Sequence, residues 1–171
     1  MNTQARQYPY VGPAEIRAGI RPGDDGPRIG SPADFDQWTA IQSIPEMADP
    51  FTFVIDVSGV LRLAPRRSEH VACAGGDPVL SAGEISFREE AGRWTVNDVT
   101  NQSIGYCPDI SSWPSVADAL DRAGIGHPPG FTHQVEFRLC PACDQLNIVR
   151  DAYYVCVFCD TDLPLEWNVG K

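Results

Sequence analysis

Apolar positions first recur at helical spacing after residue 31. Ser31 is a typical N-cap, and Pro32 suits the first turn of a helix. An apolar stripe with three-residue spacing then follows over Phe35–Ile41. The pattern predicts a short helix that ends before Pro45.

Short runs rich in β-branched and aromatic residues fill the region from 51 to 100. Such runs, bounded by Gly, Pro and Asp turn signals, are typical of antiparallel strands. The first two runs flank Ser58-Gly59, a pair that favours a hairpin turn. The runs are 51–57, 60–63, 69–73, 78–87 and 94–100. They predict a meander of four or five antiparallel strands.

A second amphipathic segment follows these runs. Ser112 or Trp113 is the expected cap, Pro114 suits the first turn, and Gly124 ends the helix. The expected buried face consists of Val116, Ala119, Leu120 and Ala123. The predicted fold class is therefore α+β, an antiparallel β-meander with two short helices.

Turn-forming residues divide the chain into four parts. Residues 1–30 are rich in Pro and Gly and predict an irregular N-terminal arm, with one short strand around Tyr8–Val11. Residues 31–124 form the expected α+β core domain. A Gly- and Pro-containing stretch makes 125–133 a linker, and residues 134–171 form a small C-terminal domain.

Four of the six cysteines lie in this last part, as two Cys-x2-Cys pairs. Twelve residues separate the pairs, which are Cys140 with Cys143 and Cys156 with Cys159. Zinc takes four ligands in a tetrahedron, and two tight turns can supply them when a hairpin brings the turns together. The intervening runs 146–149 and 153–155 flank Asp151 and suit that hairpin.

This segment resembles a zinc ribbon over about residues 134–165. The resemblance implies one structural Zn²⁺ per chain, because four cysteine ligands leave no open position for a substrate or water. Two other interpretations of the four cysteines remain open: an iron site of the rubredoxin kind, and a redox dithiol or disulfide pair.

Charge and composition then exclude several classes of function. The 171 residues include 13 basic and 23 acidic side chains, giving a formal net charge of −10. Lys171 is the only lysine, so Schiff-base and P-loop chemistry, which need an internal lysine, are excluded. No apolar stretch matches a membrane span or a secretory signal. We therefore expect a cytoplasmic protein whose cysteines are thiols or metal ligands.

The C-terminal domain itself is acidic. Its basic residues are Arg138, Arg150 and Lys171, and six acidic residues outnumber them, which gives a net charge of 3 − 6 = −3. Nucleic-acid binding normally needs a basic face, so the count favours a scaffold or protein-docking role. The aromatic residues that either dock a partner or cover the small core are Tyr153, Tyr154 and Trp167.

A polar cluster in the strand region offers candidate catalytic residues. His70 is the candidate general base, Cys107 or Ser103 the nucleophile, and Glu84 the orienting acid. The alternative is structural: a capped turn near Ser103, a buried thiol at Cys107 and a histidine bonded to a backbone carbonyl. A metal site that joins His70 to Cys73 and Cys107 has no specifying spacing.

Residues 77–84 together with 100–106 resemble a β-module found in some bacterial toxins and effectors. That module commonly ends in Ser-Gly-His-Tyr, whereas this chain has Ser103-Ile104-Gly105-Tyr106 and lacks the histidine. The resemblance covers about residues 51–124 and implies a protein of a bacterial conflict system.

Two functions follow from these patterns. The first is a zinc-stabilised, acidic, non-enzymatic interaction protein, such as an adaptor, a regulator or an immunity-type inhibitor, whose partner is a protein with a basic surface. Nucleic acid and membrane are disfavoured as partners. The alternative is a small enzyme that uses the His, Cys, Ser and Glu cluster on a nucleotide-like or acyl substrate.

Overall fold

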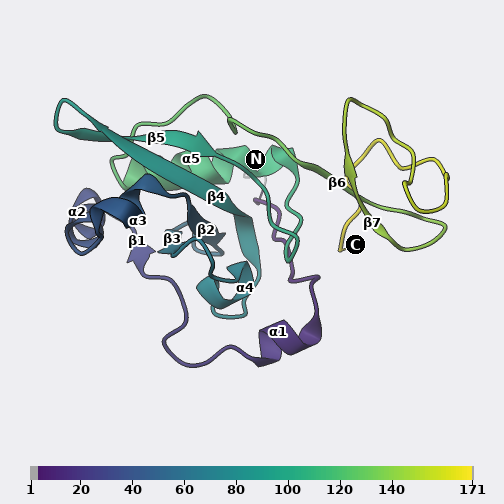
Figure 1. The fold of residues 1–171 in the computed structure, drawn as a ribbon, viewed down its shortest axis with the longest axis horizontal. Helices are drawn as coiled ribbons and strands as arrows, with labels where there is room; N and C mark the ends of the chain where they lie inside the picture. Colours follow the sequence, from purple (N-terminus) through teal and green to yellow (C-terminus); the bar gives the residue numbers. More distant parts are fainter. Residues whose placement is uncertain (1–3, 171) are drawn as a thin grey trace.

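The computed structural model describes residues 4–170; Lys171 lies outside them. Within that range a five-stranded antiparallel sheet forms the centre of the molecule, which confirms the α+β class (Figure 1). Its strands are β1 (Arg28–Ile29), β2 (Phe51–Asp56), β3 (Leu61–Ala64), β4 (Val79–Glu90) and β5 (Arg93–Val99). The helices are α1 (Ala14–Ala18), α2 (Pro32–Ala40), α3 (Ile44–Ala48), α4 (His70–Cys73) and α5 (Trp113–Arg122), with a 3-10 turn η1 (Ile110–Ser112) before α5. A second, two-stranded sheet joins β6 (Glu136–Leu139) to β7 (Leu146–Val149).

The strand order of the five-stranded sheet is β1-β3-β2-β4-β5. β2 and β3 form the predicted hairpin, and Gly59 in its turn has a φ of 78°. β4 then pairs with the free edge of β2 and not with β3, so the order departs from a simple meander. β4 and β5 form a second, long hairpin whose turn residues, Ala91 and Gly92, both have positive φ, as a type I′ turn requires.

The change of edge explains why residues 69–73 do not form the predicted strand. The chain must cross from β3 to the far side of β2, and residues 70–73 make that crossing as the short helix α4. The side chains of Val71 and Cys73, both within α4, are buried. The carbonyl of Cys73 accepts a hydrogen bond from the Gly26 N–H. The apolar run is therefore a buried helix and not a strand.

Both predicted helix starts are present. Ser31 accepts a hydrogen bond from the Asp34 N–H at the start of α2, and Pro114 lies in the first turn of α5. Ser112 precedes α5 as predicted, but its hydroxyl makes no capping bond and pairs instead with the buried Ser81 hydroxyl. Pro45 lies beyond the end of α2, as predicted, but it lies in the first turn of another helix, α3, whose cap pairs Ser43 with Glu46 in a capping box. None of the helices within residues 4–170 is long and apolar enough to cross a bilayer.

The main sheet is covered on both faces, and this burial explains why every residue of β2 is buried. Phe53 and Ile55 point to one face, where α2 and α5 supply an aromatic and aliphatic cluster. Val54 points to the other face, because successive side chains alternate along a strand. That second cluster contains residues from the N-terminal region, from α4, from the turn after β5 and from the C-terminal region: Tyr8, Val71, Cys73, Tyr106, Cys107, Val135, Phe137, Trp167 and Val169.

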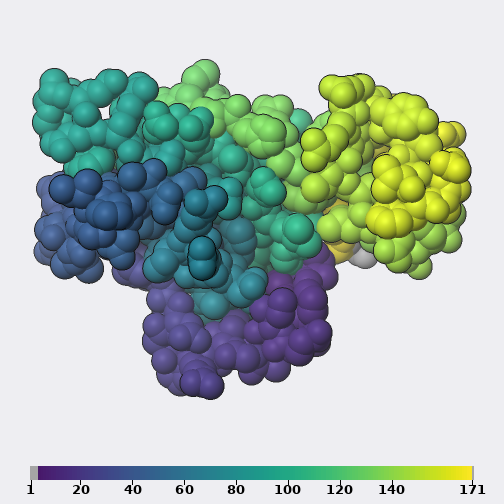
Figure 2. All heavy atoms as spheres, in the orientation of Figure 1, coloured from purple at the N-terminus to yellow at the C-terminus, as the bar shows by residue number. Residues whose placement is uncertain are grey.

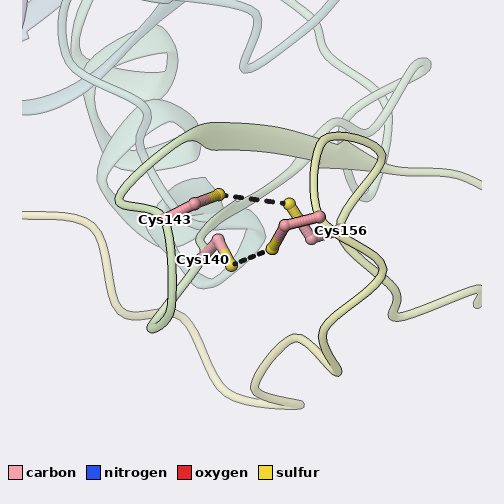
Figure 3. A group of neighbouring side chains, drawn as sticks. Cys140, Cys143 and Cys156 are labelled. Atoms are coloured by element: carbon pink, nitrogen blue, oxygen red, sulfur yellow. Dashed lines mark hydrogen bonds between the residues drawn. The ribbon is translucent and has the colours of Figure 1, made fainter.

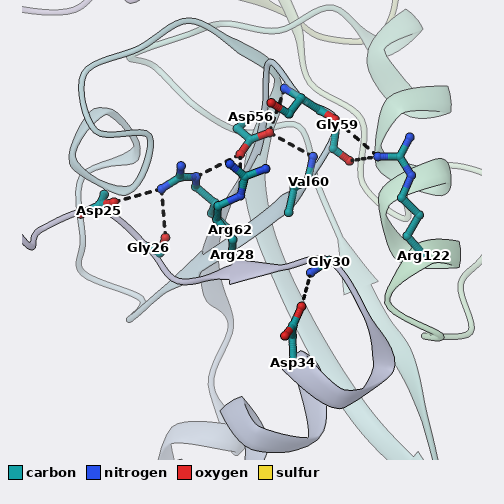
Figure 4. A network of polar contacts seen from close by, with 11 residues as sticks. Asp25, Gly26, Arg28, Gly30, Asp34, Asp56, Gly59, Val60, Arg62 and Arg122 are labelled. Atoms are coloured by element: carbon teal, nitrogen blue, oxygen red, sulfur yellow. Dashed lines mark hydrogen bonds and ion pairs between the residues drawn. The ribbon is translucent and has the colours of Figure 1, made fainter.

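A polar network fixes the β2–β3 hairpin and ties it to its neighbours (Figure 4). Asp56 is 8% exposed and accepts two backbone N–H groups of the turn at 2.9 and 3.1 Å. Its other oxygen lies 3.2 Å from Arg62 Nε and 3.6 Å from Arg28 Nε. Arg122 of α5 donates to carbonyls of the same turn, the nearer at 3.1 Å. The buried carboxylate is thus fully partnered, which favours a structural role for the network.

In Figure 1 the N-terminal region, drawn in purple, loops below the main sheet through α1 before it reaches β1, and its Tyr8 is buried in the second core cluster. Tyr8 pairs with Val79 as an isolated bridge, at the position where a short strand is expected. The rest of this stretch contains α1 and β1 and otherwise consists of turns.

Residues 125–133 lie along β5 before the chain enters β6. Ile125 and Phe131 are buried in the first core cluster, and His133 forms a parallel bridge with Thr100. In Figure 2 the residues after them, drawn in yellow-green and yellow, gather in a lobe at one end of the molecule.

Candidate metal centre

Four cysteine sulfurs meet within residues 134–170, named here the cysteine segment. The Sγ atoms of Cys140 and Cys159 are 3.6 Å apart, as are those of Cys143 and Cys156 (Figure 3). All four lie within 4.8 Å of one another. A tetrahedral ion held about 2.3 Å from each thiolate separates the sulfurs by about 3.8 Å, whereas a disulfide joins them at about 2.05 Å. The side chains are therefore positioned to bind one metal ion.

The two Cys-x2-Cys turns have the same backbone geometry. In each turn the N–H after the second cysteine, from Asp144 or Asp160, donates 3.0 Å to the carbonyl of the first. Both aspartates have positive φ, 55° and 58°, a conformation that aspartate tolerates better than most residues. Each turn thus directs two sulfurs to the same point, and the two aspartates hold the turns closed.

Hydrogen bonds to sulfur favour thiolates, the form that binds metal. Burial acts to raise the pKa of Cys156, but the Phe158 N–H and the Asn147 amide, each 3.4 Å from the sulfur, lower it to about 6. The side-chain and backbone hydrogen bonds between Cys159 and Thr161 lower the pKa of Cys159. The Gln145 backbone acts to lower the pKa of Cys143, but burial and the neighbouring sulfurs raise it to about 12. The pKa is therefore lowered at Cys156 and Cys159 and raised at Cys143.

Asn147 is the buried polar residue that links β7 to the second turn. Its amide donates to the Cys156 sulfur and to the Gln145 carbonyl, and its oxygen accepts the Val157 N–H at 3.0 Å. This role was not predicted from the sequence. The available signal was an Asn within the apolar run 146–149, where a polar side chain indicates either a position that faces solvent or a buried hydrogen-bond partner.

Strand pairing around the centre differs from the expected hairpin. The turn is present: Asp151 and Ala152 both have positive φ, and the Tyr153 N–H donates to the Arg150 carbonyl at 2.9 Å. However, β7 pairs with β6 and not with residues 153–155, whereas Val155 bridges to Asp162. The first Cys-x2-Cys turn thus lies between the paired strands β6 and β7. The second lies between Val155 and Asp162, which form a bridge.

Arg138 is buried, although in the sequence it counts among the basic residues of this region. It is 4% exposed and donates to the carbonyls of Phe137, Pro164 and Leu165 at 2.6–3.0 Å. Its guanidinium also lies over the Tyr154 ring. Arg138 therefore anchors the chain that follows the second turn and presents no positive charge to a ligand.

Of the three aromatic residues, only Tyr154 covers the small core as expected, because Trp167 belongs to the core of the main sheet. Tyr154 packs on the small core around the cysteines, and Trp167 is 7% exposed in the second core cluster. The Trp167 indole donates 2.8 Å to the Cys107 carbonyl and meets Tyr8 edge to face. Tyr153 alone of the three is exposed, at 67%.

Asn101 joins the cysteine segment to the main sheet. Its amide donates to the carbonyls of Pro108 and Val135 at 2.9 and 2.7 Å, and its oxygen accepts the Val135 N–H at 2.7 Å. The residue is completely buried. Asn101 bonds only to backbone atoms of Pro108 and Val135. Its side chain therefore positions the chain that leads into β6, whichever side chains those two residues carry.

His70, a candidate general base, lies in α4 with its ring bonded to backbone. Nε2 is 2.8 Å from the Gly83 carbonyl and must carry the proton, since a carbonyl only accepts. Burial lowers the pKa of His70, and the Gly83 bond together with the carboxylates of Glu84 and Glu69 only partly offsets this. Within residues 4–170 the carboxylate of Glu84, the candidate orienting acid, forms no hydrogen bond with the ring, whose Nε2 is occupied by the Gly83 carbonyl.

The candidate nucleophiles are buried in the turn after β5. The Ser103 hydroxyl is 1% exposed and has no hydrogen-bond partner, and the Cys107 thiol donates to the Ile104 carbonyl. Burial raises the pKa of Cys107 to about 12, the opposite of what a thiolate nucleophile needs. Among residues 4–170 neither side chain bonds to His70, and Cys140, Cys143, Cys156 and Cys159 form the one metal-binding group found.

Comparison with family models, with curated proteins and with solved structures gave no match to this chain. The four clustered sulfurs, the burial of the candidate nucleophiles and the acidic balance of the chain are therefore the basis for its function.

Proposed function

We propose that the chain is a zinc-stabilised interaction protein whose C-terminal zinc ribbon is structural. The observation that carries this is the closed set of four cysteines, whose 3.6 Å sulfur separations suit a tetrahedral ion. Four thiolates fill the coordination of zinc, so the ion would hold the two turns together without binding substrate or water.

The small size of the surrounding core supports a structural role. The buried cluster of the cysteine segment consists of Cys140, Cys156, Val149 and Leu163, and half of these residues are metal ligands. So few apolar side chains stabilise two loops weakly, and metal binding commonly supplies the missing folding free energy in such segments.

An interaction role, as adaptor, regulator or immunity-type inhibitor in the cytoplasm, fits the remaining groups better than catalysis does. The buried Cys107 thiol stays protonated near neutral pH because its pKa is raised. The acidic balance of the chain, −10, favours a partner with a basic surface.

Metal content is the first test of this proposal. Native mass spectrometry and elemental analysis of the purified chain should find one zinc ion per chain. Cys140→Ser should abolish stoichiometric zinc, whereas Cys107→Ser, a matched change at a buried cysteine outside the set, should retain it. Iron in place of zinc, or a chain that keeps its fold and its partners without metal, would contradict the proposal.

Partner binding is the second test. Affinity purification from the native host, with the zinc-loaded chain as bait and Cys140→Ser as the control, should enrich a protein with a basic surface. Recovery of background proteins alone, or turnover of a nucleotide or acyl ester that Cys107→Ser abolishes, would favour the enzyme instead.

A further inference from the structure

The outer residues of the two Cys-x2-Cys turns form an exposed apolar surface, named here the tip: Pro141, Ala142, Val157 and Phe158. Val157 is 74% exposed and Phe158 62% exposed. The four cysteines that flank these pairs converge within 4.8 Å, so both pairs lie at the same end of the cysteine segment. An exposed Phe beside an exposed Val on a fixed backbone is typical of a contact surface.

Hydrogen bonds fix Val157 and Phe158, the larger apolar residues of the tip, before any partner arrives. The Phe158 N–H bonds to the Cys156 sulfur, and the Val157 N–H bonds to the buried Asn147. The backbone is therefore fixed at both residues between Cys156 and Cys159. Binding to such a surface costs little conformational entropy, which improves affinity for a given contact area.

Negative charge surrounds the tip. Asp144 and Asp160 follow the two turns directly, Asp162 lies two residues further on, and all three are exposed. Within residues 4–170 none of them forms an ion pair. A divalent ion bound by four thiolates adds a further net charge of 2 − 4 = −2 at the same place.

No cation of the cysteine segment, within the described residues, offsets this charge at the tip. Arg138 is buried against backbone carbonyls, and Arg150 lies in the turn that joins β7 to the second cysteine pair. The tip is therefore apolar at its centre and acidic around it. Phosphate backbones, anionic lipid surfaces and a second acidic tip from another copy are all repelled by such a surface.

We propose that the tip docks a cationic protein segment in which arginine or lysine residues flank an aliphatic or aromatic side chain. The apolar side chain contacts Val157 and Phe158, and the cations pair with Asp144 and Asp160. This inference rests on the proposed interaction function and specifies the surface and the chemistry of its partner.

Peptide titration of the zinc-loaded, ¹⁵N-labelled full chain tests the proposal. The probe is a short peptide of alternating Arg and Leu with a central Phe; one control peptide replaces Arg with Glu, and another replaces Leu and Phe with Ser. The Arg/Leu/Phe probe should shift the amide signals of residues 141–144 and 157–160, and its binding should weaken as the salt concentration rises. Both control peptides should bind at least about tenfold more weakly than the probe.

Variants separate the tip from general acidity. Phe158→Ser and Asp160→Asn should each weaken peptide binding, the former by about tenfold. The matched controls Ile44→Ser, at an 88% exposed apolar residue, and Asp118→Asn, on α5, should leave it unchanged. Zinc content and the amide spectrum check that each variant is folded.

Shifts spread over the whole acidic surface, equal binding by the Arg/Ser peptide, or no effect of Phe158→Ser would overturn the tip proposal. Sedimentation experiments that detect self-association of the chain, abolished by Phe158→Ser, would also overturn the proposal. They would mean that the tip binds a second copy of this chain. If zinc and a protein partner are bound but the tip variants change nothing, the proposed function stands and only the docking site is wrong.

Discussion

Replacement of Asn101 by alanine should destabilise the whole chain, although the residue lies far in sequence from the four clustered cysteines. The side chain is completely buried between the main sheet and the cysteine segment. It supplies three hydrogen bonds of 2.7–2.9 Å to the backbone of Pro108 and Val135. Alanine removes all three and leaves one N–H and two carbonyls without those partners.

The expected loss follows from the cost of each orphaned group. A buried polar group without its partner costs about 1–3 kcal/mol, and an unpaired N–H costs more than a carbonyl, which is more often under-satisfied. We therefore expect Asn101→Ala to lower the free energy of unfolding by about 3–5 kcal/mol, a large part of the roughly 5–15 kcal/mol typical of a folded protein. Asn101→Asp should be worse still, because a carboxylate would face two carbonyl oxygens.

Urea unfolding of the zinc-loaded variants, followed by circular dichroism and by tryptophan fluorescence, measures this loss. Trp167 lies at the same junction and is one of four tryptophans, so fluorescence reports on the junction together with the core around the other three. The control is Asn97→Ala: Asn97 is exposed and bonds only to the neighbouring Asp98, so the change should stay within about 0.5 kcal/mol. A loss below about 1 kcal/mol for Asn101→Ala would refute the reasoning, because it would mean that the junction tolerates unpaired backbone groups.

Three further predictions concern single residues. Gly83→Ala should prevent folding or strongly lower the melting temperature, because its Cβ would overlap the Thr100 carbonyl oxygen, whereas Gly130→Ala, with open space around it, should be neutral. Burial holds the pKa of His70 below its ordinary 6.5, so the unfolded chain takes up a proton at His70 before the folded chain does, and stability declines as pH falls below 6.5. Urea unfolding at several pH values should show a smaller decline for His70→Gln than for the unchanged chain. Asn147→Ala removes a donor from a ligand sulfur and should weaken zinc binding about tenfold or more in competition with a chelator, and an unchanged affinity would contradict the role given to Asn147.

Local signals in the sequence were sufficient wherever a few neighbouring residues determine the structure. Ser31 accepts the N–H predicted for an N-cap, and Gly59 adopts the positive φ expected of the hairpin turn. The spacing of Cys140, Cys143, Cys156 and Cys159 likewise sufficed, because two-residue gaps constrain each pair to a tight turn. In these cases the chemistry of a residue and its structural role lie within one turn of chain.

Long-range packing accounts for what the sequence did not reveal. The run 69–73 has the composition of a strand, but the crossing between β3 and β4 buries it as a helix. The pairing of β7 with β6 likewise depends on which segments meet across the cysteines. The proximity of His70 to the Gly83 carbonyl arises from the same crossing, and no local pattern indicates it. The catalytic roles assigned to that region remain predictions.

The burial of Arg138 changes the meaning of the charge count. From the sequence alone, the C-terminal region has three cations against six acids, a balance that merely disfavours nucleic acid. In the structure the Arg138 guanidinium is occupied by backbone carbonyls, so among the described residues Arg150 is the one cation of the cysteine segment that remains exposed. The acidic character of the tip is therefore stronger than the composition indicates. Because that charge surrounds exposed Val157 and Phe158, electrostatics favours a cationic partner and the apolar pair supplies the contact it would bury.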